Sequence, residues 1–140
     1  MNLHIQSNEF NDLISIVANK MNLPEAAIER DYYIVLLLYN LSISEYAPQC
    51  VFKGGTSLSK CYPGSIERFS EDIDLTFLGM DKPDKYCEKT IKNIEKIMTK
   101  NFNTKKINEE RNARHKSMYV WFGNEENSTN VKSRCSDQTL

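Results

Sequence analysis

Hydrophobic residues recur at helical spacing through the first third of the chain. Residues 7–21 repeat apolar positions every three or four places, which predicts a helix with Ser7 as its N-cap. After a break at residues 22–24, a proline suits the first turn of a second helix that runs to about Leu41. Its stretch Ile34–Leu38 is apolar on nearly all sides and is predicted to lie in the core. The predicted inward faces comprise Phe10, Leu13, Ile14, Val17 and Met21 in the first helix, and Ile28, Tyr32, Val35, Leu36 and Tyr39 in the second.

Short β-prone segments and helices alternate in the rest of the chain. Residues 50–53 predict a strand, and residues 56–60 begin a helix that ends near Pro63. Residues 72–78 alternate apolar and polar side chains, as in a half-buried strand. A charged helix from 83 to about 102 is expected to turn Tyr86, Ile91, Ile94, Ile97 and Met98 inward, and β-prone segments at 105–108 and 116–122 and a turn at 123–127 follow it. This order predicts a mixed α/β or α+β fold.

Composition excludes several classes of protein. A length of 140 residues favours one domain. Lys and Arg total 18 against 19 Asp and Glu, so the formal net charge of −1 argues against bulk electrostatic binding of nucleic acid. The four cysteines form no C-x-x-C pair, so neither a zinc site nor a disulfide framework is predicted. Because no signal peptide begins the chain and no apolar run could span a bilayer, we predict a cytoplasmic protein without a membrane partner.

A pair of glycines joins the predicted strand at 50–53 to the helix that follows. Gly54 and Gly55 allow the backbone to approach a ligand closely and to adopt positive φ without penalty. The N–H groups of Thr56 and Ser57 at the helix start would form an anion site, and their hydroxyls could add hydrogen bonds to phosphate. An ordinary turn is the alternative interpretation of this motif. The spacing is not that of a Walker A loop.

Two aspartates begin the predicted strand at 72–78. The period of two places Asp72 and Asp74 on one face, a short distance apart. Two adjacent carboxylates repel each other, and a divalent cation resolves that conflict. Mg²⁺ prefers few carboxylates together with waters and triphosphate oxygens, and one or two such ions could serve an in-line displacement. Two solvated aspartates at the start of an exposed strand are the alternative.

The order of the two motifs is more informative than either motif alone. A strand ending in glycines, a short helix and a second strand with D-x-D would build a phosphate cradle beside a metal site. Lys60, Arg68 and Ser70 fit the same arrangement, because they offer two cations and a hydroxyl to phosphates. A solvated helix face is the alternative interpretation of Lys60.

The segments at 52–62 and 68–75 resemble the signature of AbiEii-type nucleotidyltransferases, which are toxins of type IV toxin–antitoxin and abortive-infection systems. The segment at 28–32, Ile-Glu-Arg-Asp-Tyr, resembles the helix that precedes the glycine strand in that family. The resemblance covers roughly residues 23–132 and is specific in its two central blocks. It implies a polymerase-β-like nucleotidyltransferase core, with a mixed sheet flanked by helices and preceded by an N-terminal helix pair.

The resemblance also implies roles for particular residues. Asp72 and Asp74 would be the catalytic residues and the ligands of Mg²⁺. An NTP would be the substrate, a tRNA 3′ end is the acceptor of some family members, and a cognate antitoxin would be a partner. By position, Gly55, Thr56 and Ser57 would hold the triphosphate. Together with the residues that the two motifs suggest, the predicted nucleotide-binding residues are Gly54, Gly55, Thr56, Ser57, Lys60, Arg68 and Ser70.

The pattern of the superfamily breaks near Lys132. A third carboxylate usually follows a segment like Thr129–Lys132, but here the sequence continues Ser-Arg-Cys-Ser-Asp-Gln-Thr-Leu. We therefore predict a nucleotidyltransferase domain at 1–132, helical at 1–48 with the catalytic sheet at 49–132, and an aberrant or disordered tail at 133–140. Unsupported candidates for the third carboxylate are Glu109, Glu110, Glu125 and Asp137. Core surface left uncovered by a missing second half would favour a homodimer.

Three functions remain open on the sequence. The first is Mg²⁺-dependent transfer of a nucleotidyl group from an NTP to an acceptor such as tRNA, or an inactive, truncated remnant of that enzyme. The second is a non-catalytic module that binds a nucleotide, an antitoxin-like partner or a second copy of itself. The third is a small-molecule nucleotidyltransferase of the aminoglycoside-modifying kind.

Overall fold

The computed structural model describes residues 3–62, 64, 69, 71–100, 102, 104–112, 114–122 and 129–137. From residue 104 on, the side chains that it describes are those of Arg114, Lys116, Val131 and Cys135. The main elements are α1 (Ser7–Met21), α2 (Glu25–Ser42), β1 (Cys50–Lys53), α3 (Gly54–Cys61), β2 (Asp72–Phe77), α4 (Asp84–Met98), β3 (Thr104–Asn112), β4 (His115–Phe122) and β5 (Thr129–Asp137). Two short 3-10 helices, η1 (Leu3–Ile5) and η2 (Ala47–Gln49), precede α1 and β1.

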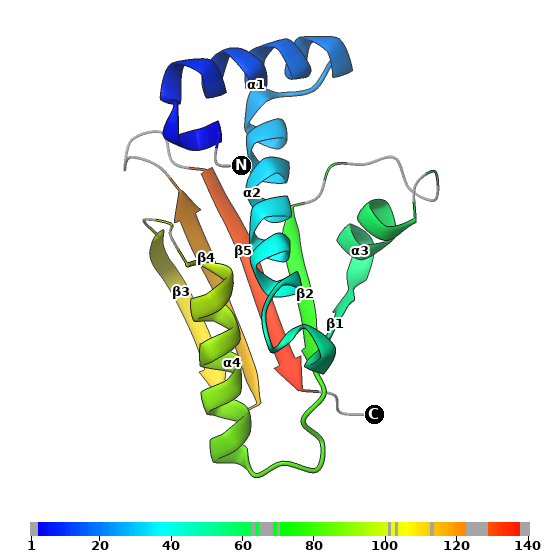
Figure 1. The fold of residues 1–140 in the computed structure, drawn as a ribbon, viewed down its shortest axis with the longest axis vertical. Coiled ribbons are helices and arrows are strands. Elements are labelled where there is room, and N and C mark those ends of the chain that lie inside the picture. Colours follow the sequence, from blue (N-terminus) through cyan, green and yellow to red (C-terminus); the bar gives the residue numbers. More distant parts are fainter. Residues whose placement is uncertain are drawn as a thin grey trace.

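Five strands form one mixed sheet in the order β1-β2-β5-β4-β3. The pair β2/β5 is parallel, and the pairs β1/β2, β4/β5 and β3/β4 are antiparallel. Helices α2 and α4 lie across one face of the sheet, and α1 crosses the N-terminal end of α2 (Figure 1). The predicted α+β fold, a mixed sheet flanked by helices and preceded by a helix pair, is confirmed. Within the described ranges, no helix has the length and apolar character that a membrane span requires.

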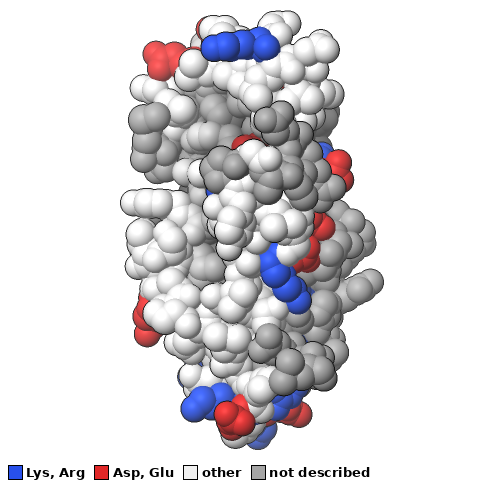
Figure 2. Space-filling model, turned by 90° about the vertical axis from the view of Figure 1, so that its right-hand side faces the viewer, with Lys and Arg blue, Asp and Glu red and all other residues white. Residues whose placement is uncertain are grey.

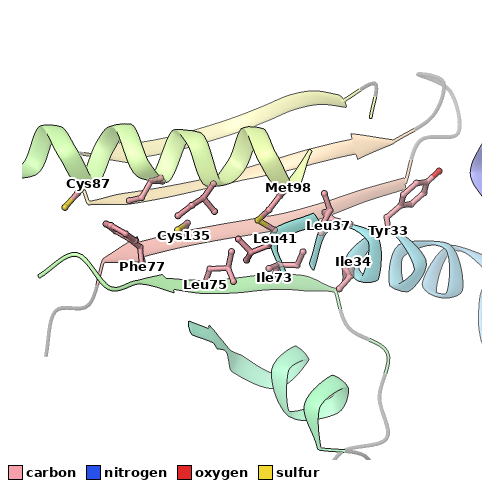
Figure 3. Packing of buried hydrophobic residues seen from close by; sticks show 13 residues of the cluster. Tyr33, Ile34, Leu37, Leu41, Ile73, Leu75, Phe77, Cys87, Met98 and Cys135 are labelled. Carbon is pink, nitrogen blue, oxygen red and sulfur yellow. The ribbon is translucent and has the colours of Figure 1, made fainter. Parts of the chain in front are cut away.

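The main core lies between the sheet and the helices α2 and α4. Side chains from both helices meet those of β2 and β5, as Figure 3 shows for Leu37, Met98, Leu75 and Cys135. Ile73 and Leu75 are almost fully buried, and they alternate along β2 with the half-buried Asp72 and Asp74. Since side chains alternate across a strand, the two aspartates lie on the face away from α2 and α4.

The predicted inward faces of the helices are only partly correct. Phe10 and Ile14 of α1 are buried with Ala18 and Ile28 in a second, smaller cluster. In α2, by contrast, Val35 and Tyr39 are 47% and 57% exposed. Periodicity could not select the right face of α2, because every position from 34 to 38 is apolar. The other predicted inward residues that are exposed are Leu13, Met21 and Tyr86, and the buried residues of α2 are Ile28, Tyr33, Ile34, Leu37 and Leu41.

Strand β5 continues past Lys132, where the sequence predicts the domain to end. Residues 133–137 pair in parallel with residues 73–77 of β2, and Cys135 is buried. The prediction of a tail is therefore corrected for these five residues, because a central strand is held by ladders on both sides. Two smaller points also concern predicted boundaries. Gln6, rather than Ser7, is the N-cap of α1, and the predicted turn at 123–127 lies outside the described residues.

A charged pair lies inside the apolar layer beneath α4. Lys116 of β4 forms an ion pair with Glu95 of α4, and the two side chains are 9% and 7% exposed. Leu75, Ile91, Ile94 and Met98 line a small cavity together with the two charged residues. Two opposite charges are thus removed from water together, which neither could tolerate alone.

Candidate nucleotide-binding site

Strand β1 leads directly into α3 through a glycine with positive φ. Lys53, the last residue of β1, pairs with Asp74 of β2, so the strand end and the second aspartate lie side by side. Gly54 then adopts a φ of 79°. That conformation strains any residue with a Cβ, so glycine is the residue that allows this strand to turn at once into a helix.

The glycine turn lies against the Asp74 carboxylate. A Cβ added to Gly54 would fall 2.9 Å from Asp74 Oδ2, which is closer than real Cβ atoms approach another heavy atom. The missing side chain therefore leaves the room that the carboxylate occupies. The structure thus places the two sequence motifs, 20 positions apart, in direct contact.

A second contact joins α3 to β2. The hydroxyl of Thr56 donates a hydrogen bond to the main-chain carbonyl of Asp72, with 2.7 Å between the oxygens, and the Thr56 residue is only 2% exposed. This hydroxyl is engaged in holding the helix start against β2. A contribution of Thr56 to phosphate binding would therefore come from its backbone N–H and not from its side chain.

The start of α3 presents backbone N–H groups without a side-chain cap. Lys53 is the N-cap residue and makes no side-chain hydrogen bond to the helix. The first N–H groups of any helix lack intrahelical acceptors, and the helix dipole adds partial positive charge at that end. Gly54, Gly55, Thr56 and Ser57 supply these groups here. Such an end suits an anion of the phosphate kind.

Asp72 and Asp74 offer carboxylate oxygens on the same side of β2. Oxygen donors of this type fit Mg²⁺ held jointly with triphosphate oxygens. Among the residues that the structure describes, no cluster of three or more His, Cys, Asp or Glu side chains could hold a metal by itself. The two aspartates therefore fit a cation that a nucleotide helps to bind, rather than a preformed cage.

Of the remaining predicted site residues, Lys60 is the one that the structure describes. Lys60 lies in the last turn of α3, and its ammonium forms an ion pair of 2.5 Å with Asp31 of α2. No spacing rule in the sequence joins Asp31 to Lys60, because the two residues are 29 positions apart. The neighbouring Arg30 approaches Glu71, with 4.0 Å between the charged atoms. Arg68 and Ser70 lie outside the described residues.

The strand next to β2 carries basic residues at the two positions paired with the aspartates. Lys132 is paired with Asp72, and Arg134 is paired with Asp74. The acidic position on β5 is Asp137, which is paired with Phe77 at the far end of β2. The structure therefore brings none of the predicted third carboxylates to the β5 positions beside Asp72 and Asp74.

The other candidates for a third carboxylate lie elsewhere. Glu109 and Glu110 belong to β3, which β5 and β4 separate from β2. Three strand spacings amount to roughly 14 Å, which is too far for a shared ion. Glu125 lies outside the described residues.

Charge on this side of the molecule is scattered. Among the described residues of the face drawn in Figure 2, Lys and Arg side chains lie beside Asp and Glu side chains, and the coloured atoms form no continuous area of one sign. This pattern agrees with the formal net charge of −1.

Comparison with known proteins places this arrangement in the nucleotidyltransferase fold. The MenT4 nucleotidyltransferase toxin of Mycobacterium tuberculosis H37Rv superposes with a TM-score of 0.59 at 23% identity, over 89% of this chain and 42% of that toxin. JHP933 from Helicobacter pylori gives a TM-score of 0.55 at 17% identity, over 83% of this chain and 46% of that protein. The chain thus spans less than half the length of either solved protein.

The sequence of the chain identifies its family. The sequence profile of the nucleotidyl transferase AbiEii toxins of type IV toxin–antitoxin systems matches residues 36–134. The chain belongs to the AbiEii family. A search of curated proteins finds no match to this chain.

Proposed function

We propose that this chain binds an NTP together with Mg²⁺ and forms the nucleotide-binding part of a toxin-type nucleotidyltransferase. The observation that carries the proposal is the contact between the Gly54 turn and the Asp74 carboxylate. It brings a helix start that suits phosphate next to carboxylates that suit a cation. Membership of the AbiEii family supports the same reaction class.

The residues of the candidate site would have different roles in binding the nucleotide. The N–H groups at the start of α3 would bind the triphosphate, and Gly54 keeps the approach open. Thr56 holds the helix start on β2 through the Asp72 carbonyl. Asp72 and Asp74 would hold Mg²⁺, which when bound offsets phosphate charge and favours attack on the α-phosphorus.

The acceptor and the protein partner follow from the family alone. The profile names a toxin of a type IV toxin–antitoxin system, and MenT4 is likewise a nucleotidyltransferase toxin. We therefore propose a cognate antitoxin as partner and a tRNA 3′ end as acceptor. Incubation with labelled NTPs and either total tRNA or aminoglycosides would separate this acceptor from a small-molecule one.

A second function is favoured by a specific observation. Positions 132 and 134, which pair with Asp72 and Asp74, are occupied by Lys and Arg. Two paired positions of neighbouring strands lie on the same face of the sheet. Without a carboxylate there, no group is assigned to deprotonate the attacking hydroxyl. A non-catalytic module that binds a nucleotide or a protein partner is therefore the alternative to the enzyme.

Two matched substitutions test nucleotide binding. Asp72→Asn and Asp74→Asn should each weaken Mg²⁺-dependent NTP binding at least about tenfold, because each removes a charged ligand of the cation. Asp81→Asn, at an exposed position just beyond β2, should leave the affinity unchanged. Calorimetric titration with and without EDTA measures the effect, and circular dichroism confirms that the variants fold. Unchanged binding in both variants would remove the metal assignment.

A gain-of-function variant tests the alternative. Arg134→Glu places a carboxylate at the position paired with Asp74. If the third carboxylate is what the chain lacks for turnover, this variant should bind Mg²⁺ more tightly than the original chain and transfer label from an NTP to tRNA. Tighter Mg²⁺ binding without transfer would favour the binding module.

A further inference from the structure

Helix α2 contacts both halves of the candidate site through two consecutive residues. Asp31 forms its ion pair with Lys60 at the end of α3, and Arg30 approaches Glu71, which precedes Asp72. The Asp31–Lys60 contact is short and half-buried, with the side chains 17% and 28% exposed. The Glu71 side chain is 84% exposed, so the Arg30–Glu71 contact is the weaker of the two.

The two ends of α3 are attached to different elements. Thr56 attaches its first turn to the Asp72 carbonyl of β2, and Lys60 attaches its last turn to Asp31 of α2. A helix of eight residues is a stiff rod of about 12 Å. A movement at its last turn therefore swings its first N–H groups relative to Asp72 and Asp74.

The Asp31–Lys60 pair is not explained by stability alone. Asp31 Oδ1 is shielded from solvent and finds no hydrogen-bond partner among the described residues. A buried oxygen without a hydrogen bond lowers the stability of the fold. Proteins in which well-packed apolar residues replace a buried ion pair are often as stable as the original or more stable. A contribution to placement is a physical reason for a carboxylate at position 31.

We propose that Asp31 is a positioning residue for the nucleotide site, which acts through Lys60 to aim the start of α3 at the triphosphate. This inference rests on the proposed function. Asp31 precedes the segment 36–134 that the family profile matches. Lys60 held by Asp31 is directed toward α2, so its effect on the nucleotide passes through the orientation of α3.

The test compares two properties of Asp31→Asn. In nucleotide-free protein, amide hydrogen exchange at residues 54–57 should accelerate, because the end of α3 is released. Affinity for Mg²⁺–ATP should fall about tenfold, with a change in thermal midpoint of only a few degrees. Asp31→Glu, which keeps the carboxylate, should recover much of the affinity. Glu88→Gln breaks an exposed pair with Lys92 on α4 and should change neither property.

A double variant tests the route through Lys60. In a Lys60→Met background, Asp31→Asn should cause no further loss of affinity. An equal further loss in that background would show that Asp31 acts independently of Lys60 and would overturn the inference. The inference would also be overturned if Asp31→Asn lowered the thermal stability but changed neither the amide exchange at residues 54–57 nor the affinity. If the original chain binds none of the four common NTPs with Mg²⁺, the proposed function fails, and the exchange measurement still decides whether Asp31 orders the glycine turn.

Discussion

The β1–β2 edge of the sheet and its centre beneath α4 both bring charged groups next to apolar side chains, but they do so differently. Beneath α4, Glu95 and Lys116 neutralise each other inside the core. At the edge, Asp72 and Asp74 carry the same sign and alternate with the buried Ile73 and Leu75. The central pair is almost fully shielded from solvent, whereas the two aspartates remain half-buried on the opposite face.

Strand β2 links the two regions. Its inward residues belong to the core with α2 and α4, and its outward residues belong to the candidate site. Close packing therefore holds the strand in place, and the positions of the two carboxylates follow from it. The comparison teaches that the opposite charges in the centre offset each other within the core, whereas the like charges at the edge repel each other, a repulsion that a bound cation would relieve.

The largest effect should come from opening the central pair. Glu95→Ala leaves the Lys116 ammonium buried without this partner, and removing one member of such a pair costs about 3–5 kcal/mol. Replacing both residues, as Glu95→Leu with Lys116→Met, should restore most of that stability. Urea unfolding measures both variants.

A surface pair on the same helix provides the control for the central one. Glu88→Ala removes a partner of Lys92 at exposed positions and should cost about 0.3–0.5 kcal/mol. If Glu95→Ala costs no more than Glu88→Ala, the central pair does not differ from a surface pair, and the contrast between the two regions is lost.

An intermediate effect should come from the glycine turn. Gly54 and Gly64 both have positive φ, 79° and 83°, so alanine at either position should cost roughly 1–2 kcal/mol. A Cβ at Gly64 meets nothing within 4 Å, whereas a Cβ at Gly54 displaces the Asp74 carboxylate. Gly54→Ala should therefore also weaken Mg²⁺–NTP binding by about tenfold, whereas Gly64→Ala should leave it unchanged.

The matched glycine variants separate strain from site geometry. Urea unfolding should show a similar loss in the free energy of unfolding for the two variants. Calorimetric titration should show that they differ in their affinity for Mg²⁺–NTP. Equal affinity in Gly54→Ala and Gly64→Ala would mean that the position of the Asp74 carboxylate does not matter for the nucleotide.

Local patterns predicted the elements that carry the site. The strand at 72–78 is observed as Asp72–Phe77, and the strand at 50–53 as Cys50–Lys53, because alternation and the following glycines are written in adjacent residues. The contact between the two motifs also depends on a short separation in the sequence, since β1, α3 and β2 are consecutive in the chain. Their binding roles remain predictions.

Contacts between distant segments escaped prediction. Residues 133–137 lack alternation, yet they form a strand because β2 and β4 supply partners on both sides. The pairing of Asp31 with Lys60 depends on how α2 lies over the end of α3, which no local pattern encodes. In α2, uniform apolarity concealed which residues face the sheet.

The reactivity of the four thiols should provide the finest comparison of the two regions, with the smallest effect on stability. Cys61 is exposed at the end of α3, whereas Cys87 and Cys135 are buried in the core. Burial raises the pKa of Cys50 from 9.0 to about 11. An ordinary thiol therefore has about 100-fold more thiolate than Cys50 at pH 8.

Reaction with iodoacetamide, followed by mass spectrometry, measures the reactivity of each thiol. Cys61 should be modified first and Cys50 far more slowly, with Cys50 gaining reactivity as the pH approaches 11. Cys87 and Cys135 should react only when the protein unfolds. Equal rates for Cys50 and Cys61 at pH 8 would show that the start of β1 is as open as the end of α3, and the boundary between core and edge would then lie deeper in the sheet.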